Sequence, residues 1–289
     1  MIRVCIEPTM FEITPAQEKQ NVYVDASYVL NRERVSREHA KMTKAFAYTP
    51  VYVYKIVPKG KVHLPDIVFI ANGGLSLPRL PERCILLPYM KYAQRKRELP
   101  YLKGIFNDLG LKTIPFPGSP SAPFEGQAEL KWFHGGTLAV GGYGYRSTKE
   151  SFEVLKRLFA DVYGKQGVAP PKILALPLES EKYYHLDVAM LEHDDKCIVH
   201  KRAFSAASIF ALETFLGKGS VFVLDTEDSF CLNAVVDGKN LITHKLTDPK
   251  VRGILESVTG LEIKEADTSE FEKSGGSVRC MTLDVYAVN

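Results

Sequence analysis

Long apolar runs are missing from this sequence, and so is a leader for export. No stretch approaches the roughly 18 consecutive apolar residues that a membrane-spanning helix needs. Near the start, Glu7 and Pro8 stand where a secretory signal would have its apolar region. We therefore expect a cytoplasmic protein that does not have the membrane as a partner.

Paired cysteines and a strong net charge are missing too. The five cysteines are odd in number and form no CxxC pair, a pattern that suits neither a disulfide framework nor a zinc knuckle. Formal net charge is only +3, from 37 basic and 34 acidic residues, so no overall field favours nucleic acid as a partner. We expect reduced thiols.

What the chain does have is enough apolar sequence for a large core, arranged as alternating helices and short strands. Its 289 residues are 45% hydrophobic, which fits one large domain or two ordinary ones. Ser147 and Glu150 have the spacing of a capping box, and the basic run 95–97 is typical of a solvated helix face. The residue patterns predict helices at residues 33–46, 98–109, 148–163, 205–216 and 249–258, and strands at residues 3–6, 51–57, 66–71, 84–87, 137–140, 173–176, 197–200, 221–224 and 240–243.

A repeat is visible where polar residues head the predicted strands. Such residues recur at spacings of 53, 60, 48 and 47 along the chain. They are Asn72, Glu125, His185, Asn233 and Cys280. Five ββαβ units stacked around an axis would bring all five to one end of it. Any α/β protein alternates in this way, but polar groups at buried strand starts need partners, which favours the repeat.

Cys280 is a candidate nucleophile. It follows Gly275 and Gly276, which give the backbone the freedom to turn a thiol toward a cleft. By itself this stretch favours an inert packed thiol, because free cysteines are often buried. His185 is the best of seven histidines as its acid and base, since it heads an apolar strand of the repeat. Glu125 belongs to the same expected rim.

Carboxylates crowd this expected pocket, namely those of Glu125, Glu129 and Asp187. They would raise the pKa of a neighbouring thiol, which opposes catalysis unless the substrate is a cation. A guanidinium is planar and always charged, and carboxylates match its forked shape. Arg146, just ahead of a helix, would then hold an acidic group at the other end of the substrate; the alternative is a surface arginine in a loop.

Five short motifs, in chain order over residues 66–285, resemble those of the pentein guanidino-modifying superfamily. The first is similar to the motif of the branch that contains dimethylarginine dimethylaminohydrolase-like and arginine dihydrolase-like proteins. The motifs are Phe69-Ile70-Ala71-Asn72-Gly73-Gly74, Glu125-Gly126-Gln127, Gly144-Tyr145-Arg146-Ser147-Thr148, His185-Leu186-Asp187 and Gly275-Gly276-Ser277-Val278-Arg279-Cys280-Met281-Thr282. The resemblance implies one catalytic domain over residues 1–289, folded as a five-bladed pseudo-symmetric α/β propeller of ββαβ repeats.

The resemblance also implies roles for individual residues. Cys280 would attack the guanidinium carbon, His185 would act as acid and base, and Glu125 would orient His185. No metal or organic cofactor is implied. The substrate-binding residues would be Asp187 and Asn72 at the guanidinium nitrogens, Arg146 at the α-carboxylate, Arg95 as a second and looser match, and Glu129, where the family more often has Asp.

One departure from the family concerns the identity of the guanidine. Relatives of this branch usually carry an Asn-Pro-Trp-Met-like segment near the N-terminus that meets the substrate, and this chain has Asp25-Ala26-Ser27-Tyr28 in that region. The difference touches the shape of the substrate more than the thiol chemistry. It therefore leaves the reaction class standing and the substrate open.

The first functional hypothesis is a cysteine-dependent hydrolase of arginine or a methylated arginine. It would pass through a covalent thiouronium and give citrulline with ammonia or methylamine. The alternative is an amidinotransferase, in which an amine replaces water in the second step. A non-catalytic binding protein of the same fold, as in ribosome anti-association factors, is disfavoured by the presence of Cys280, His185 and Glu125 together. The sequence is compatible with a homo-oligomer.

Overall fold

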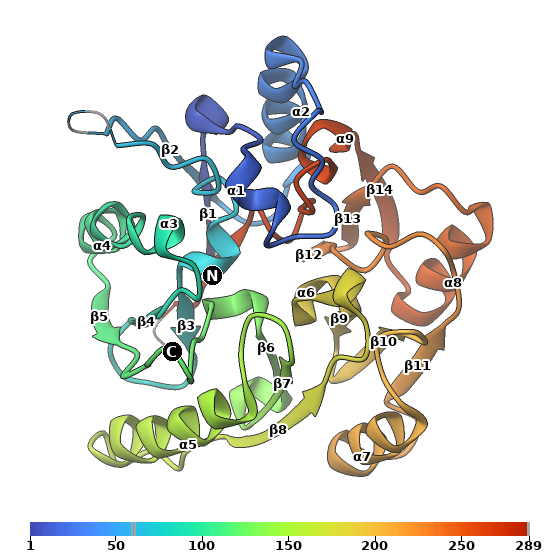
Figure 1. The fold of residues 1–289 in the computed structure, drawn as a ribbon. Coiled ribbons are helices and arrows are strands. Elements are labelled where there is room, and N and C mark those ends of the chain that lie inside the picture. Colours follow the sequence, from blue (N-terminus) through green and yellow to red (C-terminus); the bar gives the residue numbers. More distant parts are fainter. Residues whose placement is uncertain (59, 61, 288–289) are drawn as a thin grey trace.

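Five three-stranded sheets surround a common centre in the computed structural model, which describes residues 1–58, 60 and 62–287 (Figure 1). In every sheet the first strand pairs antiparallel with the second, and the second pairs in parallel with the third. A helix connects the second strand to the third, as a parallel pair requires a crossover. The expected five-bladed α/β propeller of ββαβ units is confirmed.

One blade joins the two ends of the chain. β15 (Leu283–Val285) pairs antiparallel with β1 (Ile2–Ile6), which pairs in parallel with β2 (Val51–Tyr54). The segment that carries Cys280 therefore leads into a strand fixed against the N-terminus. The other blades are β3 (Leu75–Leu77), β4 (Cys84–Leu87) and β5 (Lys112–Pro115); β6 (Leu130–Phe133), β7 (Leu138–Tyr143) and β8 (Lys172–Pro177); β9 (Met190–His193), β10 (Lys196–His200) and β11 (Val221–Leu224); and β12 (Val235–Asp237), β13 (Asn240–His244) and β14 (Glu262–Ala266).

The longer helices lie on the outer side of the blades (Figure 1). Side-chain caps set several of their starts: Asn31, Thr148, Ser205 and Asp248 each accept a backbone N–H of the first turn. Shorter helices stand in the connections. The long helices are α2 (Arg32–Ala45), α4 (Leu99–Asp108), α5 (Lys149–Gly164), α7 (Ala206–Leu216) and α8 (Pro249–Thr259), and the short ones are α1 (Pro15–Glu18), α3 (Ala93–Lys96), α6 (Leu186–Ala189) and α9 (Ser269–Glu272).

Apolar clusters fill the spaces between neighbouring blades. One of them, for example, joins Leu75 and Leu86 of the β3–β5 blade to Phe152 and Phe159 of the next. Each blade thus buries apolar side chains against both neighbours, and the core is a ring rather than a single layer. The polar residues at the blade ends are thereby held in fixed positions around the axis.

Residues 66–71 do not form the strand that their apolar run predicted. The chain turns there, and Ile70–Gly73 form a 3-10 helix. Ile67 packs in the cluster of the β1 and β4 blades, and Val68 packs in the cluster that contains Val235. A turn can bury apolar side chains on opposite sides just as a buried strand does, and this is why the prediction was wrong.

Short turns also precede the other inner strands, so the recurring polar residues do not head the strands directly. Glu125 caps the 3-10 helix Gly126–Ala128, and His185 caps α6. The capping box of α5 is formed by Thr148 and Ser151, one residue beyond the predicted pair. The short helices α1 and α9 were not predicted.

No helix in the described part of the chain is long and apolar enough to cross a membrane. All five cysteines fall within the described ranges, where they are buried and form no disulfide.

Candidate active site

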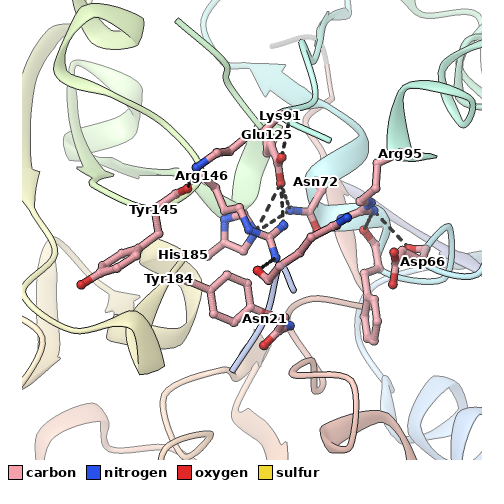
Figure 2. Close-up of polar contacts among 12 residues, drawn as sticks. Asn21, Asp66, Asn72, Lys91, Arg95, Glu125, Tyr145, Arg146, Tyr184 and His185 are labelled. Carbon is pink, nitrogen blue, oxygen red and sulfur yellow. Dashed lines mark hydrogen bonds and ion pairs between the residues drawn. The ribbon is translucent and has the colours of Figure 1, made fainter. Parts of the chain in front are cut away.

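The recurring polar residues meet at one end of the propeller. The Nδ2 atom of Asn72 lies 3.2 Å from Oε2 of Glu125 and 2.9 Å from Nε2 of His185, and Figure 2 shows these three side chains converging. The Nδ2 atom of Asn233 lies 3.1 Å from the sulfur of Cys280. Cys280, His185 and Asn72 line the same pocket. Five segments far apart in the sequence thus contribute to one site.

Cys280 is held by contacts with residues that are distant in the sequence. Its sulfur is 3.5 Å from Oδ2 of Asp187, and its carbonyl accepts the N–H of Ala71 at 3.0 Å. Gly276 approaches the ring of Phe69 so closely that a Cβ atom would lie 2.2 Å from a ring carbon. Glycine is therefore required for the segment before Cys280 to take this path.

His185 is gripped at both ring nitrogens. Its Nδ1 lies 2.7 Å from Oε1 of Glu129, and its Nε2 lies 3.4 Å from Oε2 of Glu125. Because the Asn72 amide donates to Nε2, the ring proton belongs on Nδ1, facing Glu129. Burial, followed by the charges of Arg146 and Arg95, lowers the pKa of His185 well below its ordinary value. The imidazole is therefore neutral, and its Nε2 lone pair accepts the hydrogen bond from Asn72.

Both glutamates contact the His185 ring, although the sequence analysis assigned Glu129 to the substrate and only Glu125 to His185. Glu129, assigned to the substrate, is fully buried and makes the shorter contact to the His185 ring. Burial, with repulsion from Glu125, raises the pKa of Glu129 well above its ordinary value. Glu125, assigned to orient His185, is also bound to Arg146 and to the backbone N–H of Lys91.

Asp187 carries a carboxylate with spare hydrogen-bonding capacity beside the thiol. It is fully buried, and its Oδ1 has no hydrogen-bond partner among the described residues. Burial raises its pKa to about 6, although the charges of Lys131 and Arg279 oppose the shift. Burial and then the Asp187 charge raise the pKa of Cys280 well above its ordinary value. In the absence of a cation the sulfur is thus a thiol.

Two buried arginines line the pocket, as Figure 2 shows. Arg146 lies between aromatic rings, with its Cζ 4.9 Å from the centre of Tyr92 and 4.8 Å from that of Tyr184. Arg95 lies on α3, pairs with Glu98 at 2.9 Å and is only 5% exposed, so it does not belong to the solvated face predicted for its basic run. Both guanidiniums are in place to meet an anionic group in the pocket.

An N-terminal segment that sequence reasoning overlooked crosses the pocket. Gln17 donates to Oδ1 of Asp66 at 2.5 Å, Asn21 donates to the carbonyl of Ser274 at 3.0 Å, and the carbonyl of Gln20 accepts from Arg146. The space left beneath is a cavity of about 30 Å³, enough for one or two water molecules. An arginine-sized ligand is larger than this cavity, so groups that line it, such as residues 17–21, must shift to admit one.

Tyr184 and Asn233 also belong to the site, although the sequence analysis gave neither of them a role. They differ in how visible they are in the sequence. Tyr184 stands directly before His185 and donates to the carbonyl of Gly275 at 2.6 Å. Nothing in its local sequence marks it. Asn233, by contrast, was visible as a member of the polar repeat, although no role was assigned to it.

Comparison with known proteins gives relatives but no matching family model. The chain is 26% identical over 224 residues to the bifunctional arginine dihydrolase/ornithine cyclodeaminase ArgZ of Synechocystis sp., an alignment that covers 76% of this chain and 29% of that protein. It is 28% identical over 232 residues to N(G),N(G)-dimethylarginine dimethylaminohydrolase of Mycobacterium tuberculosis, covering 77% and 67%. The chain therefore spans less than a third of the length of ArgZ.

Solved structures agree on the fold. The apo structure of ArgZ matches with a TM-score of 0.80 at 24% identity, over 97% of this chain and 40% of that one. An adduct of dimethylarginine dimethylaminohydrolase with S-methyl-L-thiocitrulline matches with a TM-score of 0.70 at 18% identity, over 97% and 98%. Together with the sequence relatives, these matches confirm the resemblance to the pentein guanidino-modifying superfamily.

Proposed function

We propose that this protein is a cysteine-dependent hydrolase that cleaves a guanidino C–N bond of arginine or a close derivative. The observation that carries the proposal is the pairing of the Cys280 thiol with the Asp187 carboxylate, 3.5 Å away, beside the pocket that Cys280 and His185 line. A buried carboxylate beside a nucleophilic sulfur is harmful until a cation neutralises it. A guanidinium both fits the spare oxygen of Asp187 and favours the thiolate.

In the first step the sulfur of Cys280 bonds to the guanidinium carbon, and the thiol proton passes to His185. His185 then donates a proton to the departing nitrogen, the C–N bond breaks, and ammonia leaves behind a covalent S-alkylthiouronium. A neutral imidazole is suited to accept the proton. Glu125, 3.4 Å from Nε2, would stabilise the imidazolium that forms.

In the second step His185 takes a proton from water, and the hydroxide adds to the same carbon. The C–S bond breaks, His185 returns its proton to Cys280, and the new hydroxyl group loses its proton to solvent, which leaves a ureido product, citrulline when the substrate is arginine. Glu129 holds the imidazole through Nδ1 in both steps, so we assign to it the orienting role that sequence reasoning gave to Glu125.

The remaining charged residues would bind the rest of the substrate. Asn72 and Asp187 face the guanidinium, and Arg146 and Arg95 meet the α-carboxylate at the other end. Arg146 would then exchange its contact with the carbonyl of Gln20 for one with the ligand as the N-terminal segment opens. We propose that residues 1–289 form a single catalytic domain of this kind.

Arginine is the favoured substrate. ArgZ and AgrE are named arginine dihydrolases, and solved forms of them include a complex with L-arginine and a covalent reaction intermediate. Their structures match this chain with TM-scores of up to 0.80, against 0.70 for the dimethylarginine dimethylaminohydrolase adduct. The activity named for these relatives, arginine dihydrolase, leads us to include a second hydrolysis, that of the ureido product, in the test below.

A substrate panel tests the proposal. The protein and its Cys280→Ser variant are incubated with arginine, monomethylarginine, dimethylarginine and agmatine, with and without an added amine, and ammonia, methylamines, ureido product and ornithine are measured. We expect arginine to be consumed by the wild type only. Two ammonia molecules per arginine would indicate a second round, transfer to the amine would indicate an amidinotransferase, and turnover of no guanidine would refute the proposal.

A further inference from the structure

Asn233 contacts both Cys280 and the backbone of Asp187. It is fully buried in the turn before β12. Its Oδ1 accepts the backbone N–H of Arg279 at 3.0 Å and that of Cys280 at 3.2 Å. Because both backbone groups are donors, the carbonyl of the amide must face them. The Nδ2 group is therefore turned toward the sulfur.

That Nδ2 group makes two contacts. It lies 3.1 Å from the sulfur of Cys280 and donates to the carbonyl of Asp187 at 3.1 Å. One amide thus ties together the backbone of the nucleophile, its reacting atom and the turn that carries Asp187. All of these side-chain contacts go to residues 279–280 or to Asp187. None of them joins Asn233 to a part of the fold away from the site.

The chemistry of the contact differs between the two forms of the sulfur. An N–H group donates strongly to a thiolate and only weakly to a neutral thiol, so the contact stabilises the charged form. It opposes the neighbouring Asp187 charge, which disfavours that form. A backbone hydrogen bond at Ser277 acts in the same direction as Asn233.

We propose that Asn233 is a catalytic residue whose amide N–H stabilises the Cys280 thiolate while its carbonyl fixes the backbone of the nucleophile. This rests on the proposed function, in which Cys280 reacts as a thiolate. The proposal gives a catalytic role to Asn233, the fourth residue of the polar repeat. Each of the five blades then supplies one residue to the reaction. Asn233 would act alongside the substrate cation, which removes the opposing charge only after it has bound.

The test measures thiolate formation without requiring turnover. Alkylation of Cys280 by iodoacetamide is followed by peptide mass spectrometry as a function of pH for the wild type, Asn233→Ala and Asn233→Asp. Asn233→Asp retains an oxygen for the two backbone N–H groups and replaces the donor. Cys280→Ser gives the background from the other thiols. Asn240→Ala is the matched control, because Asn240 is a buried asparagine in the same blade whose Oδ1 has no partner among the described residues.

We expect both Asn233 variants to alkylate about 10- to 100-fold more slowly at a given pH, the effect of losing a hydrogen bond to a charged group. The pH profile should shift upward, and kcat should fall with little change in KM. Asn240→Ala should leave the profile unchanged. If Asn233→Asp alkylates like the wild type and only Asn233→Ala is impaired, Asn233 is a backbone tether and the proposal is wrong. A wild type that turns over no guanidine would defeat the proposed function, and the alkylation result would still decide the role of Asn233.

Discussion

The carboxylate of Asp187 lies 3.5 Å from the sulfur of Cys280 and accepts a hydrogen bond from its thiol. The pair is buried, and the Asp187 charge disfavours the thiolate form of Cys280, whereas the hydrogen bond from the thiol favours the charged form of Asp187. A protein that needed only a packed cysteine would have no use for this arrangement. A cation placed between the two groups reverses its effect, and the first prediction follows from that.

Asp187→Asn should change two measurements in opposite directions. The free protein should alkylate at Cys280 faster at a given pH, because the charge that raises the pKa of the thiol is gone. The value of kcat/KM for arginine should fall by about 100-fold, since the guanidinium loses a charged partner. Asp161→Asn, on the exposed face of α5, serves as the control. If alkylation and turnover fall together, Asp187 supports the fold of the site and does not control the charge of the sulfur.

The contacts of His185 predict which glutamate orients it. Glu129 makes the 2.7 Å contact to Nδ1, so Glu129→Gln should lower kcat by about 10- to 100-fold through loss of a charge-assisted hydrogen bond. Steady-state kinetics of Glu129→Gln and Glu125→Gln, compared at several pH values, would separate the two residues. A Glu129→Gln enzyme that is fully active beside an inactive Glu125→Gln enzyme would restore the assignment made from sequence.

A second histidine predicts how stability depends on pH. His244 lies 2.7 Å from Oδ1 of Asp228 and 3.1 Å from Oε1 of Glu272. Burial alone would lower its pKa, but these two carboxylates raise it to about 9. Since the folded value lies above the ordinary value of 6.5, the stabilisation is complete below pH 6.5 and is lost as the pH rises to 9.

The size of the effect can be measured by denaturant unfolding. The free energy of unfolding should fall by about 3 kcal/mol between pH 6.5 and 9 in the wild type. His244→Gln should be less stable at pH 6 and nearly independent of pH over the same interval. A wild type whose unfolding free energy is flat across this range would show that His244 is not charged in the native protein.

Gly275 predicts a defect in turnover that exceeds the defect in stability. Its φ is +80°, and a Cβ atom would lie 2.4 Å from Nδ2 of Asn21. Gly275→Ala should cost about 1 kcal/mol in backbone strain and should displace either the N-terminal segment or the segment that leads to Cys280. Comparison of kcat and thermal melting for Gly275→Ala, with and without Asn21→Ala, measures both parts. If Asn21→Ala restores none of the lost activity, the clash with Asn21 is not its cause.

The sequence predicted the blades better than their inner ends. Strands such as β4 and β11 were placed at their observed bounds, because each is a short continuous apolar run bounded by polar residues or proline. The turns at Asn72 and Glu125 were mistaken for strand starts. Apolar residues are buried in the packed interface between blades in turns as well as in strands, so an apolar run does not distinguish the two conformations. That burial is set by neighbouring blades, which local patterns do not encode.

The site shows the same division. Cys280 and His185 were found because a thiol, an imidazole and a repeated spacing are visible in one dimension. Whether Glu125 or Glu129 faces Nδ1 of His185 depends on the side-chain directions at the two ends of the 3-10 helix Gly126–Ala128. The spacing of the two residues in the sequence does not predict these directions. The N-terminal segment was overlooked because Gln17 and Asn21 act through hydrogen bonds to Asp66 and Ser274, contacts that only the closed propeller creates.

The central claim is that Cys280 forms a covalent bond to the guanidinium carbon, and acid quenching during turnover tests it most directly. The wild type is mixed with arginine, quenched within the first turnovers, digested and analysed by mass spectrometry, with Cys280→Ser as the control. We predict an adduct on the peptide that contains Cys280, with the mass of arginine less ammonia, which decays as ureido product appears. Turnover of arginine without any adduct on Cys280, or with the adduct on another cysteine, would contradict the account.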